Sequence, residues 1–255
     1  MIDLIDRQDG GRRPEVIISD TGSYSDMVCG LMRLLGFDYR PQLADLPDAK
    51  LWRINPGADY GPLATAARGK IDLGRIRAHW PDLLRLAGSI HTGAVSAHDV
   101  LRMLAHGGNP TQLGEALAHY GRIFKTLHVL SYIDQAPYRA QIKGMRNLQE
   151  GRHDRARHVF HGRRGDLRRA YHEGMEDQLG ALGLVLNCIT LWNTVYLDRT
   201  ITTLNKDENT TDPELLRYLS PLGWEHINLT GDYTWPRANH IKPGKYRPLR
   251  RPAKP

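Results

Sequence analysis

The hydrophobic pattern of this 255-residue chain begins with a strand-like run and continues at helical spacing. Glu15 to Ser19 reads EVIIS, with three apolar β-branched residues in a row, and predicts a buried strand that ends at Asp20. Tyr24 to Leu35 then repeats apolar residues at helical spacing, with Ser23 as the expected N-cap and Gly36 as the expected stop. The first part of the chain therefore predicts a strand followed directly by a helix.

Short elements and then helices are predicted for most of the remaining chain. Phe37 to Arg40 predicts a second short strand, and residues 41–80, which contain four prolines, predict loops around short elements. From Pro81 onward the pattern is helical almost throughout, whereas residues 220–235 are again irregular. The expected helices are 81–91, 96–106 with Ser96 as cap, 111–134, 137–160, 166–205 with a candidate break near Gly180 and Gly183, and 212–219.

The longest apolar run, Leu179 to Leu197, distinguishes a soluble protein from a membrane protein. It is long enough to span a bilayer, but asparagines and threonines interrupt it. We therefore interpret it as a buried helix of a soluble protein, with no membrane partner. Trp192 and Trp224 are expected to lie in the core.

Composition excludes several classes of protein. Hydrophobic residues make up 40% and charged residues 25%, which is ordinary for a globular chain and excludes wholesale disorder. The two cysteines, Cys29 and Cys188, cannot build a disulfide framework and do not stand at zinc-ligand spacing. Met1 to Glu15 carries acids and lacks the apolar core of a signal peptide. We expect a reduced, intracellular compartment.

Positive charge is concentrated in two places. Seven of the 35 lysines and arginines lie between Arg237 and Pro255 without any acid, and prolines keep this tail from forming a regular helix. The remaining 28 are balanced by 28 acids, so the body is neutral and the net charge of +7 belongs to the tail. Inside the body, Arg152 to Arg169 sets seven arginines against two aspartates.

Either basic cluster alone is compatible with a solvated face. The two together, in a chain with a pI near 9.5, favour nucleic acid as the partner. The residues expected to contact DNA are Arg146, Arg152, Arg155, Arg157, Arg163, Arg164 and Arg168 in the body, and Arg237, Lys242, Lys245, Arg247, Arg250 and Arg251 in the tail.

Asp20 is the first candidate for chemistry, because it follows the predicted strand directly. A carboxylate at a strand end is held rigidly and is exposed at the edge of the sheet, a good position for a hard metal ion. The alternative is a turn residue or a helix cap, and the pattern alone leaves both open.

Glu150 is the second candidate, in a predicted helix between Arg146 and Arg157. Spacings of four and seven residues place these three side chains on one helix face. The arrangement is compatible with a surface ladder of ion pairs, or with a metal-binding carboxylate whose neighbouring cations hold a phosphodiester. Spacing alone does not choose between them.

Several hydrolytic site types find no support in the sequence. It has no Gly-x-Ser-x-Gly elbow, no phosphate-binding loop ending in Gly-Lys-Ser/Thr and no His-Glu-x-x-His motif. Glu225 and His226 are adjacent, but regular geometry would point their side chains apart, so we interpret both as structural.

Five stretches of the sequence, taken in order, match the pattern of one known family. They are Asp20 to Asp26 (DTGSYSD), Arg77 to Trp80 (RAHW), Glu150 to Arg164, Asn187 to Leu197 (NCITLWNTVYL) and Ser220 to Tyr233 (SPLGWEHINLTGDY). Over nearly its whole length the chain resembles the carboxyl-terminal part of Tn-three family transposases.

The resemblance implies a transposase of the Asp-Asp-Glu type, with Asp20 as the second aspartate and Glu150 as the glutamate. It implies an α/β, predominantly helical fold, in which a helical insertion interrupts a ribonuclease-H-like core. In such enzymes two Mg²⁺ (or Mn²⁺) ions held by the three carboxylates activate a water and then a DNA 3′ hydroxyl. The implied partners are transposon-end and target DNA, with full-length transposase as a homo-oligomeric partner. The implied location is the bacterial cytoplasm, at the nucleoid.

The chain departs from the family pattern before Asp20. The first aspartate and two further strands of a ribonuclease-H-like core need roughly 40 residues or more ahead of that strand. Asp3, Asp6 and Asp9 are therefore too close to Asp20 to be the first aspartate. We expect a partial core that lacks its first strands. The expected segments are 1–40, a partial core of strand, helix and strand; 41–136, an insertion; 137–236, a helical completion of the core; and 237–255, a basic extended tail.

These expectations lead to a specific functional hypothesis. The chain is a catalytic-region fragment of a DNA transposase that nicks and joins transposon ends, and it is inactive alone because the first aspartate is missing. Two alternatives stay open: a non-enzymatic DNA-binding fragment that associates with full-length transposase, and the unstable product of a pseudogene.

Overall fold

The computed structural model describes residues 2–6, 12–20, 24–44, 46–47, 49–160, 173–206, 212–228 and 231–232. The chain divides into two compact units, Met1–Arg146 and Asn147–Pro255, and the long helix α7 contains residues of both. The four segments expected from the sequence stay a prediction, because a division into two compact units does not test their boundaries.

The described part of the chain is mostly helical, as expected. Its α-helices are α1 (Ile2–Asp6), α2 (Asp26–Leu34), α3 (Leu73–Ala78), α4 (Trp80–His91), α5 (Ala97–Ala105), α6 (Gln112–Asp134), α7 (Ala136–Val159), α8 (Met175–Lys206) and α9 (Pro213–Leu216), and the 3₁₀ helices are η2 (Gly61–Thr65) and η3 (His106–Gly108). The strands are β1 (Val16–Ile17), β2 (Asp38–Tyr39), β3 (Trp52–Arg53) and β4 (Gly69–Lys70).

The predicted strand, helix and strand at the start of the chain are confirmed. β1 and β2 pair in parallel, with Val16 opposite Asp38 and Ile17 opposite Tyr39, and α2 connects them. Backbone hydrogen bonds prolong the pairing beyond the two strands, because the Gln42 N–H donates to the Ser19 carbonyl at 2.9 Å. The residue before Asp20 is therefore still held to its neighbouring chain.

The ends of α2 follow helix-capping rules. Ser25, with φ −95° and ψ 151°, is the N-cap, and its hydroxyl accepts a hydrogen bond from the Val28 N–H. The expectation that Ser23 is the cap is wrong, because the helix begins at Asp26 and the Ser25 hydroxyl already serves its free N–H groups. Gly36 ends the helix as expected, with a φ of +85° that suits glycine.

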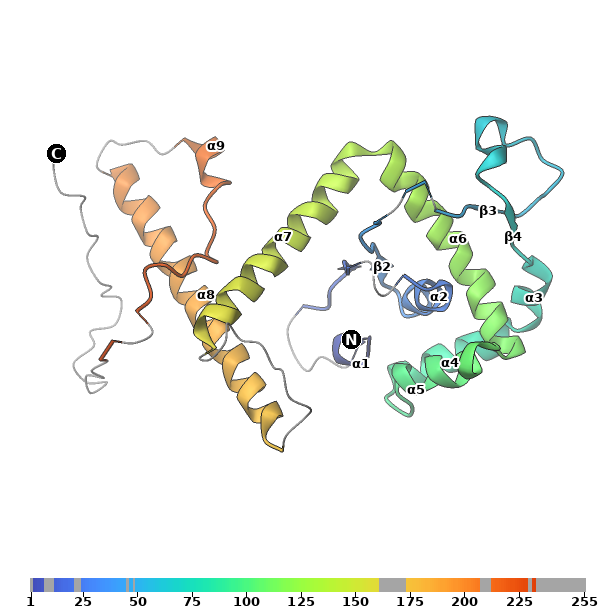
Figure 1. The fold of residues 1–255 in the computed structure, drawn as a ribbon, viewed down its shortest axis with the longest axis horizontal. Helices are drawn as coiled ribbons and strands as arrows, with labels where there is room; N and C mark the ends of the chain where they lie inside the picture. Colours follow the sequence, from blue (N-terminus) through green and yellow to red (C-terminus); the bar gives the residue numbers. More distant parts are fainter. Residues whose placement is uncertain are drawn as a thin grey trace. The chain divides into compact units, whose positions relative to one another are not determined.

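Two glycines let α2 and α6 cross at close range (Figure 1). A Cβ atom on Gly30 would lie 2.6 Å from the Leu117 carbonyl oxygen, and one on Gly121 would collide with the Asp26 carbonyl. Because the two backbones touch here, α2 is fixed against α6 without intervening side chains. This crossing sets the distance between the start of α2 and the cations on α6.

Residues 41–80 contain the short elements that the sequence leads us to expect. β3 and β4 form a second parallel pair, in which Trp52 lies opposite Gly69, and α3 follows β4. The Asp72 side chain caps α3 by accepting a hydrogen bond from the Arg75 N–H. In the described part of the chain, strands occur only as these two parallel pairs.

The unit formed by residues 1–146 has two apolar clusters. The larger one brings together α1, β1, α2, β2, α4, α5 and α6 around fully buried side chains such as Leu31, Leu83 and Leu117. The smaller one joins the 43–51 segment to α6 and the start of α7 through Leu43, Val129 and Ile142. Burial of these side chains is the main force that holds α2 and the strands on α6.

Two expectations about helices in the second unit are wrong. α8 runs unbroken from Met175 to Lys206, so the candidate break near Gly180 and Gly183 is wrong. Each glycine costs a helix roughly 1 kcal/mol relative to alanine, too little to end a helix of 32 residues. α9 stops at Leu216, three residues before the expected end.

α8 is also more exposed than the sequence suggests. It is long and apolar enough to cross a membrane by length and composition alone, and only 11% of its most apolar window is buried. The expected buried helix is therefore not observed among the described residues. Trp192, expected in the core, is 44% exposed, because α8 buries mainly the stripe that contains Leu186, Ile189 and Asn193.

Candidate functional site

The chain places Asp20 at the carboxyl end of the β1 segment, as predicted. Its side chain is exposed, while the preceding residue is anchored: the Ser19 hydroxyl lies 2.7 Å from the Tyr39 hydroxyl and also donates to the Asp20 carbonyl at 3.0 Å. The backbone at this exposed carboxylate therefore has a defined position. This arrangement fits the metal-ligand interpretation of Asp20 and also its interpretation as a turn residue.

An ion cluster lies just beyond Asp20, at the start of α2. The Asp26 carboxylate accepts from Arg122 Nε at 2.8 Å through one oxygen and from Lys125 Nζ at 3.0 Å through the other. Lys125 also donates to the Tyr24 carbonyl at 3.2 Å. These side chains are largely buried, so the pairs fix the start of α2 against α6 more firmly than surface pairs would. Local sequence spacing does not predict these ion pairs.

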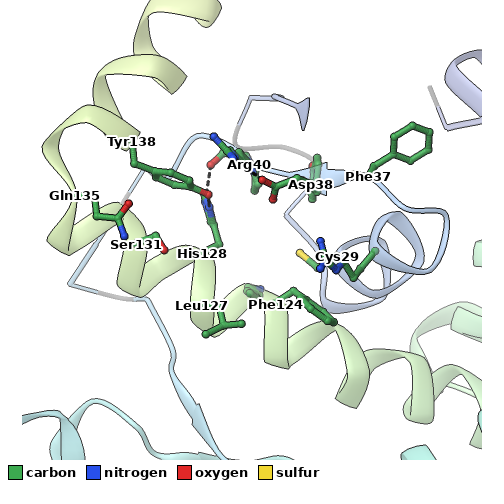
Figure 2. A pocket seen from close by; sticks show the side chains of 14 residues that line it. Cys29, Phe37, Asp38, Arg40, Phe124, Leu127, His128, Ser131, Gln135 and Tyr138 are labelled. Atoms are coloured by element: carbon green, nitrogen blue, oxygen red, sulfur yellow. Dashed lines mark hydrogen bonds and ion pairs between the residues drawn. The ribbon is translucent and has the colours of Figure 1, made fainter. Parts of the chain in front are cut away.

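A cavity of about 350 Å³ between α2, the β2 segment and α6 is built around a histidine (Figure 2). His128 Nε2 lies 2.9 Å from the Pro41 carbonyl, which can only accept, so this nitrogen carries the proton. Nδ1 then accepts from the Tyr138 hydroxyl at 2.8 Å. Burial lowers the pKa of His128, which favours this neutral form.

The chemistry of this cavity is structural. Both nitrogens of His128 are occupied, so neither is free to move a proton for a ligand. The Arg40 guanidinium lies over the Tyr138 ring and pairs with Asp38, as Figure 2 shows. His128 therefore joins α6 to the start of α7 and to the β2 segment. Sequence reasoning missed it, because one histidine within a helical pattern carries no distinguishing signal.

Glu150 lies on α7 as predicted, and its side chain is exposed. Its carboxylate is 3.9 Å from His153 Nδ1, whereas Arg157 pairs with Asp154 at 2.7 Å. The face shared with Arg146 and Arg157 follows from the helix, but Glu150 pairs with neither arginine among the described contacts, so the alternative of an ion-pair ladder is not observed. The exposed Glu150 carboxylate has only this distant ion pair among the described contacts, so it can bind a ligand.

The predicted DNA-contacting arginines differ in accessibility. Arg146 and Arg157 are exposed on α7, and Arg152 is partly buried, with Nη2 3.4 Å from the Asn187 side-chain oxygen. The other positions lie outside the described residues: Arg163, Arg164, Arg168, Arg237, Lys242, Lys245, Arg247, Arg250 and Arg251.

Arg155 differs from its neighbours because its side chain is fully buried. Its guanidinium donates to the carbonyls of Leu222 and Pro221 and, at 2.6 Å, to the Thr190 hydroxyl. Asn193 binds the same segment, donating to Pro221 and Gly223. With its donors turned inward, Arg155 is placed to hold residues 221–223 on α7 and α8, and we leave it out of the DNA-contacting set proposed below.

The two residues interpreted as structural have structural contacts. The Glu225 carboxylate accepts from the Trp224 N–H at 3.1 Å, and backbone N–H groups lower the pKa of Glu225. His226 Nε2 lies 2.9 Å from the Asn193 side-chain oxygen. Among the described contacts, the two side chains form no hydrogen bond with each other.

The described side chains do not form a complete metal site. They contain no group of three or more histidine, cysteine, aspartate or glutamate residues close enough to hold an ion. Asp20 belongs to the first unit and Glu150 to the second, and both side chains are exposed. The described residues therefore fit an oxygen-ligand set for a metal ion only in part.

Comparison with known proteins covers both carboxylates. The family model described as the Tn3 transposase DDE domain matches residues 1–233. The transposase of transposon Tn4556 from Streptomyces fradiae is 55% identical over 98% of this chain, which corresponds to 28% of that relative. The transposase of transposon gamma-delta from Escherichia coli K12 is 42% identical over 95% of this chain and 24% of its own length. That of Tn501 from Pseudomonas aeruginosa is 41% identical over 95% of this chain and 25% of its own length.

The share of each relative that is matched bears on function. This chain spans about a quarter of the length of these curated relatives. What the longer proteins do as wholes is therefore a property of polypeptides about four times as long.

Proposed function

The chain belongs to the Tn3 transposase DDE domain family, and from this membership we propose that it acts in DNA transposition. It serves as part of the catalytic region of a transposase that nicks transposon-end DNA and joins it to a target. A DDE transposase domain implies a ribonuclease-H-like fold, and the parallel β1–α2–β2 unit is compatible with a portion of one. That the complete fold has further strands ahead of β1 is part of this proposal.

One observation carries the proposal: Asp20 ends a pinned strand within a match that also includes Glu150. Asp20 and Glu150 are the carboxylates that this chain contributes, and the site is completed by a further carboxylate from the rest of the transposase. Hard oxygen ligands of this kind suit Mg²⁺ or Mn²⁺. The role of this chain's residues is to hold the two carboxylates, through the strand end and through α7.

DNA is held by arginines of α7 and by the tail. Arg146, Arg152 and Arg157 are the described members of this set, and the tail adds seven basic residues without an acid. Such contacts neutralise backbone phosphates, so the binding they provide depends on salt and tolerates many sequences. The proposed partners are transposon-end and target DNA, in the bacterial cytoplasm, with full-length transposase as a second copy.

The proposal predicts that the chain by itself has little or no nicking activity, because it offers two of the three carboxylates. The test compares it with a hybrid in which it replaces the matching quarter of the Tn4556 transposase. Each protein is incubated with a transposon-end duplex and Mg²⁺ or Mn²⁺. We expect specific nicks from the hybrid only. Specific nicks by the chain alone would show that its own residues complete the site.

A second candidate function is DNA binding without catalysis, in association with full-length transposase. The presence of seven basic residues and no acid in residues 237–255 favours this second function. Deleting this tail should weaken binding to a generic duplex and flatten its dependence on salt, by up to roughly 0.9 in logarithmic slope for each lost phosphate contact. Unchanged affinity after the deletion would remove the tail from the proposed DNA surface. A hybrid that fails to nick while the chain binds DNA would favour this second function.

A further inference from the structure

A second cavity, of about 560 Å³, opens beside the strand that carries Asp20. It lies entirely within the unit formed by residues 1–146. Its volume falls within the range of sites that take small ligands. Its walls combine the rings of Tyr24 and Trp52, the cations Lys50, Arg122 and Lys125, and the acid Asp26 with an amide and apolar residues.

The charge of these walls favours an anion. Asp26 is the one acid among the lining residues, and it is already shared by Arg122 and Lys125. Lys50 adds a third cation with an exposed side chain. One carboxylate against three cations leaves two positive charges in a recess where water screens them less than at the open surface.

The aromatic walls add a requirement that a simple anion does not have. The Lys125 ammonium lies 3.9 Å from the centre of the Tyr24 ring and 5.5 Å from that of the Trp52 ring. Trp52 is supported from behind by Gly69, where a Cβ atom would collide with the indole. The Trp52 ring is thus fixed in place, next to the open volume of the cavity and to the cations that line it. Flat aromatic surfaces next to guanidinium and ammonium groups are what proteins use to hold bases of single strands.

The cavity wall is hydrogen-bonded to the backbone just before Asp20. The Gln42 N–H donates to the Ser19 carbonyl at 2.9 Å, one residue before Asp20, and Tyr24 follows Asp20 by four positions. The Tyr24 ring forms part of the cavity wall, while its hydroxyl is buried and has no hydrogen-bond partner among the described residues. A ligand bound here would lie next to the strand end that holds Asp20.

We propose that the cavity between Tyr24, Trp52 and Lys125 binds one unpaired nucleotide of the DNA substrate. Its phosphate is held by Arg122, Lys125 and Lys50, and its base lies against Trp52. The inference rests on the proposed function and deepens it, because it adds a site for a nucleotide that has left the duplex beside the strand of Asp20. An acidic peptide would use the cations but gain little from the rings, and this difference decides the test.

The test uses the complete 255-residue chain and a dye-labelled single strand of about 15 nucleotides, with a duplex of the same sequence as the second probe. Fluorescence anisotropy measures both affinities. A 2-aminopurine base in the single strand reports stacking by the quenching of its fluorescence. Trp52→Leu removes the aromatic face, Trp52→Phe restores one, and Lys50→Gln removes an exposed cation. Lys70→Gln, at an exposed lysine of β4 outside the lining residues, is the matched control.

We expect Trp52→Leu to weaken single-strand binding by about tenfold and to abolish the quenching, since stacking on one aromatic ring is worth roughly 1–3 kcal/mol. Trp52→Phe should retain most of both signals, Lys50→Gln should weaken binding several-fold, and Lys70→Gln should change little. Duplex affinity should be nearly the same in all variants, because the basic surface remains.

Three outcomes would overturn the inference. Single-strand affinity and quenching that survive Trp52→Leu would show that the base lies elsewhere. Binding of polyglutamate that matches that of the single strand, and is indifferent to Trp52, would identify an acidic peptide as the ligand. Absence of binding to either DNA probe would contradict the proposed function as well, whereas duplex binding without any single-strand binding would overturn the nucleotide site alone.

Discussion

His128 and Arg155 show how a single residue can hold a large part of this chain without leaving a trace in its sequence pattern. Each joins segments that are distant in sequence, His128 through Pro41 and Tyr138, and Arg155 through residues 221–222 and Thr190. Both work because a buried polar group must find hydrogen-bond partners. Their partners are chosen by tertiary packing, so the sequence alone could not distinguish Arg155 from the exposed arginines around it.

His128→Phe should lower the free energy of unfolding at pH 7.5 by about 1–3 kcal/mol, because the Pro41 carbonyl and the Tyr138 hydroxyl lose their partner. Urea unfolding followed by circular dichroism measures this loss. His98→Asn, at an exposed histidine, is the control and should change little. A variant as stable as the parent chain would show that these two hydrogen bonds contribute nothing net.

The same variant should alter the dependence of stability on pH. Burial lowers the pKa of His128 below its ordinary value of 6.5, so the folded chain binds fewer protons than the unfolded chain as the pH falls below about 6.5. The stability that neutral His128 contributes at neutral pH is therefore lost as the pH falls from about 6.5 toward the lower pKa of His128 in the folded chain. Burial also lowers the pKa of His119, so the variant should keep a shallower pH dependence. An identical dependence in both chains would contradict the assignment of a neutral His128.

Arg155→Met should destabilise the unit formed by residues 147–255 by about 3 kcal/mol, because buried hydrogen bonds from a charged group are lost and the Leu222 carbonyl loses its described partner. Thermal unfolding followed by tryptophan fluorescence measures this change. Arg157→Gln, at an exposed arginine of the same helix, should change stability by less than about 0.5 kcal/mol. If Arg155→Met kept full stability but lost DNA affinity, Arg155 would be a DNA contact.

At the scale of whole elements, most helices of the described chain can be predicted from its sequence. Apolar spacing predicts α4 to α7 within one or two residues, and Ser96 caps α5 as expected. The failures have physical causes. Gly180 and Gly183 suggest a break, but a long helix tolerates them. Ser23 resembles a cap, yet the position of the first turn is set by Asp26, which is paired with α6 and invisible to local pattern.

Gly121→Ala should destabilise the unit formed by residues 1–146 by roughly 2 kcal/mol or more, since the added methyl group meets the Asp26 carbonyl and pushes α2 away from α6. Gly144→Ala on α7 is the matched control: it faces open space, and alanine favours a helix by up to about 1 kcal/mol. Urea midpoints should therefore move in opposite directions. Equal, small shifts in the two variants would contradict the close backbone contact.

For the whole molecule, the sequence places the candidate residues on their elements but not relative to one another. Asp20 follows its strand and Glu150 lies on its helix as predicted, because strand and helix periods are local properties. The cavity at Trp52 was beyond prediction, since it joins the start of α2, the 42–50 segment and α6 through tertiary contacts. The exposed face of α8 was missed because an apolar run does not reveal how much of it is covered.

The central claim is that Asp20 and Glu150 serve the same catalytic reaction in a Tn3 family transposase. The most direct measurement is the transposition frequency supported in cells by the hybrid that carries this chain in the Tn4556 transposase. Asp20→Asn and Glu150→Gln should each abolish transposition while protein levels stay unchanged. Glu15→Gln, before β1, and Asp154→Asn, on α7, change exposed carboxylates nearby and should leave it nearly intact. Transposition that survives either Asp20→Asn or Glu150→Gln would contradict the claim.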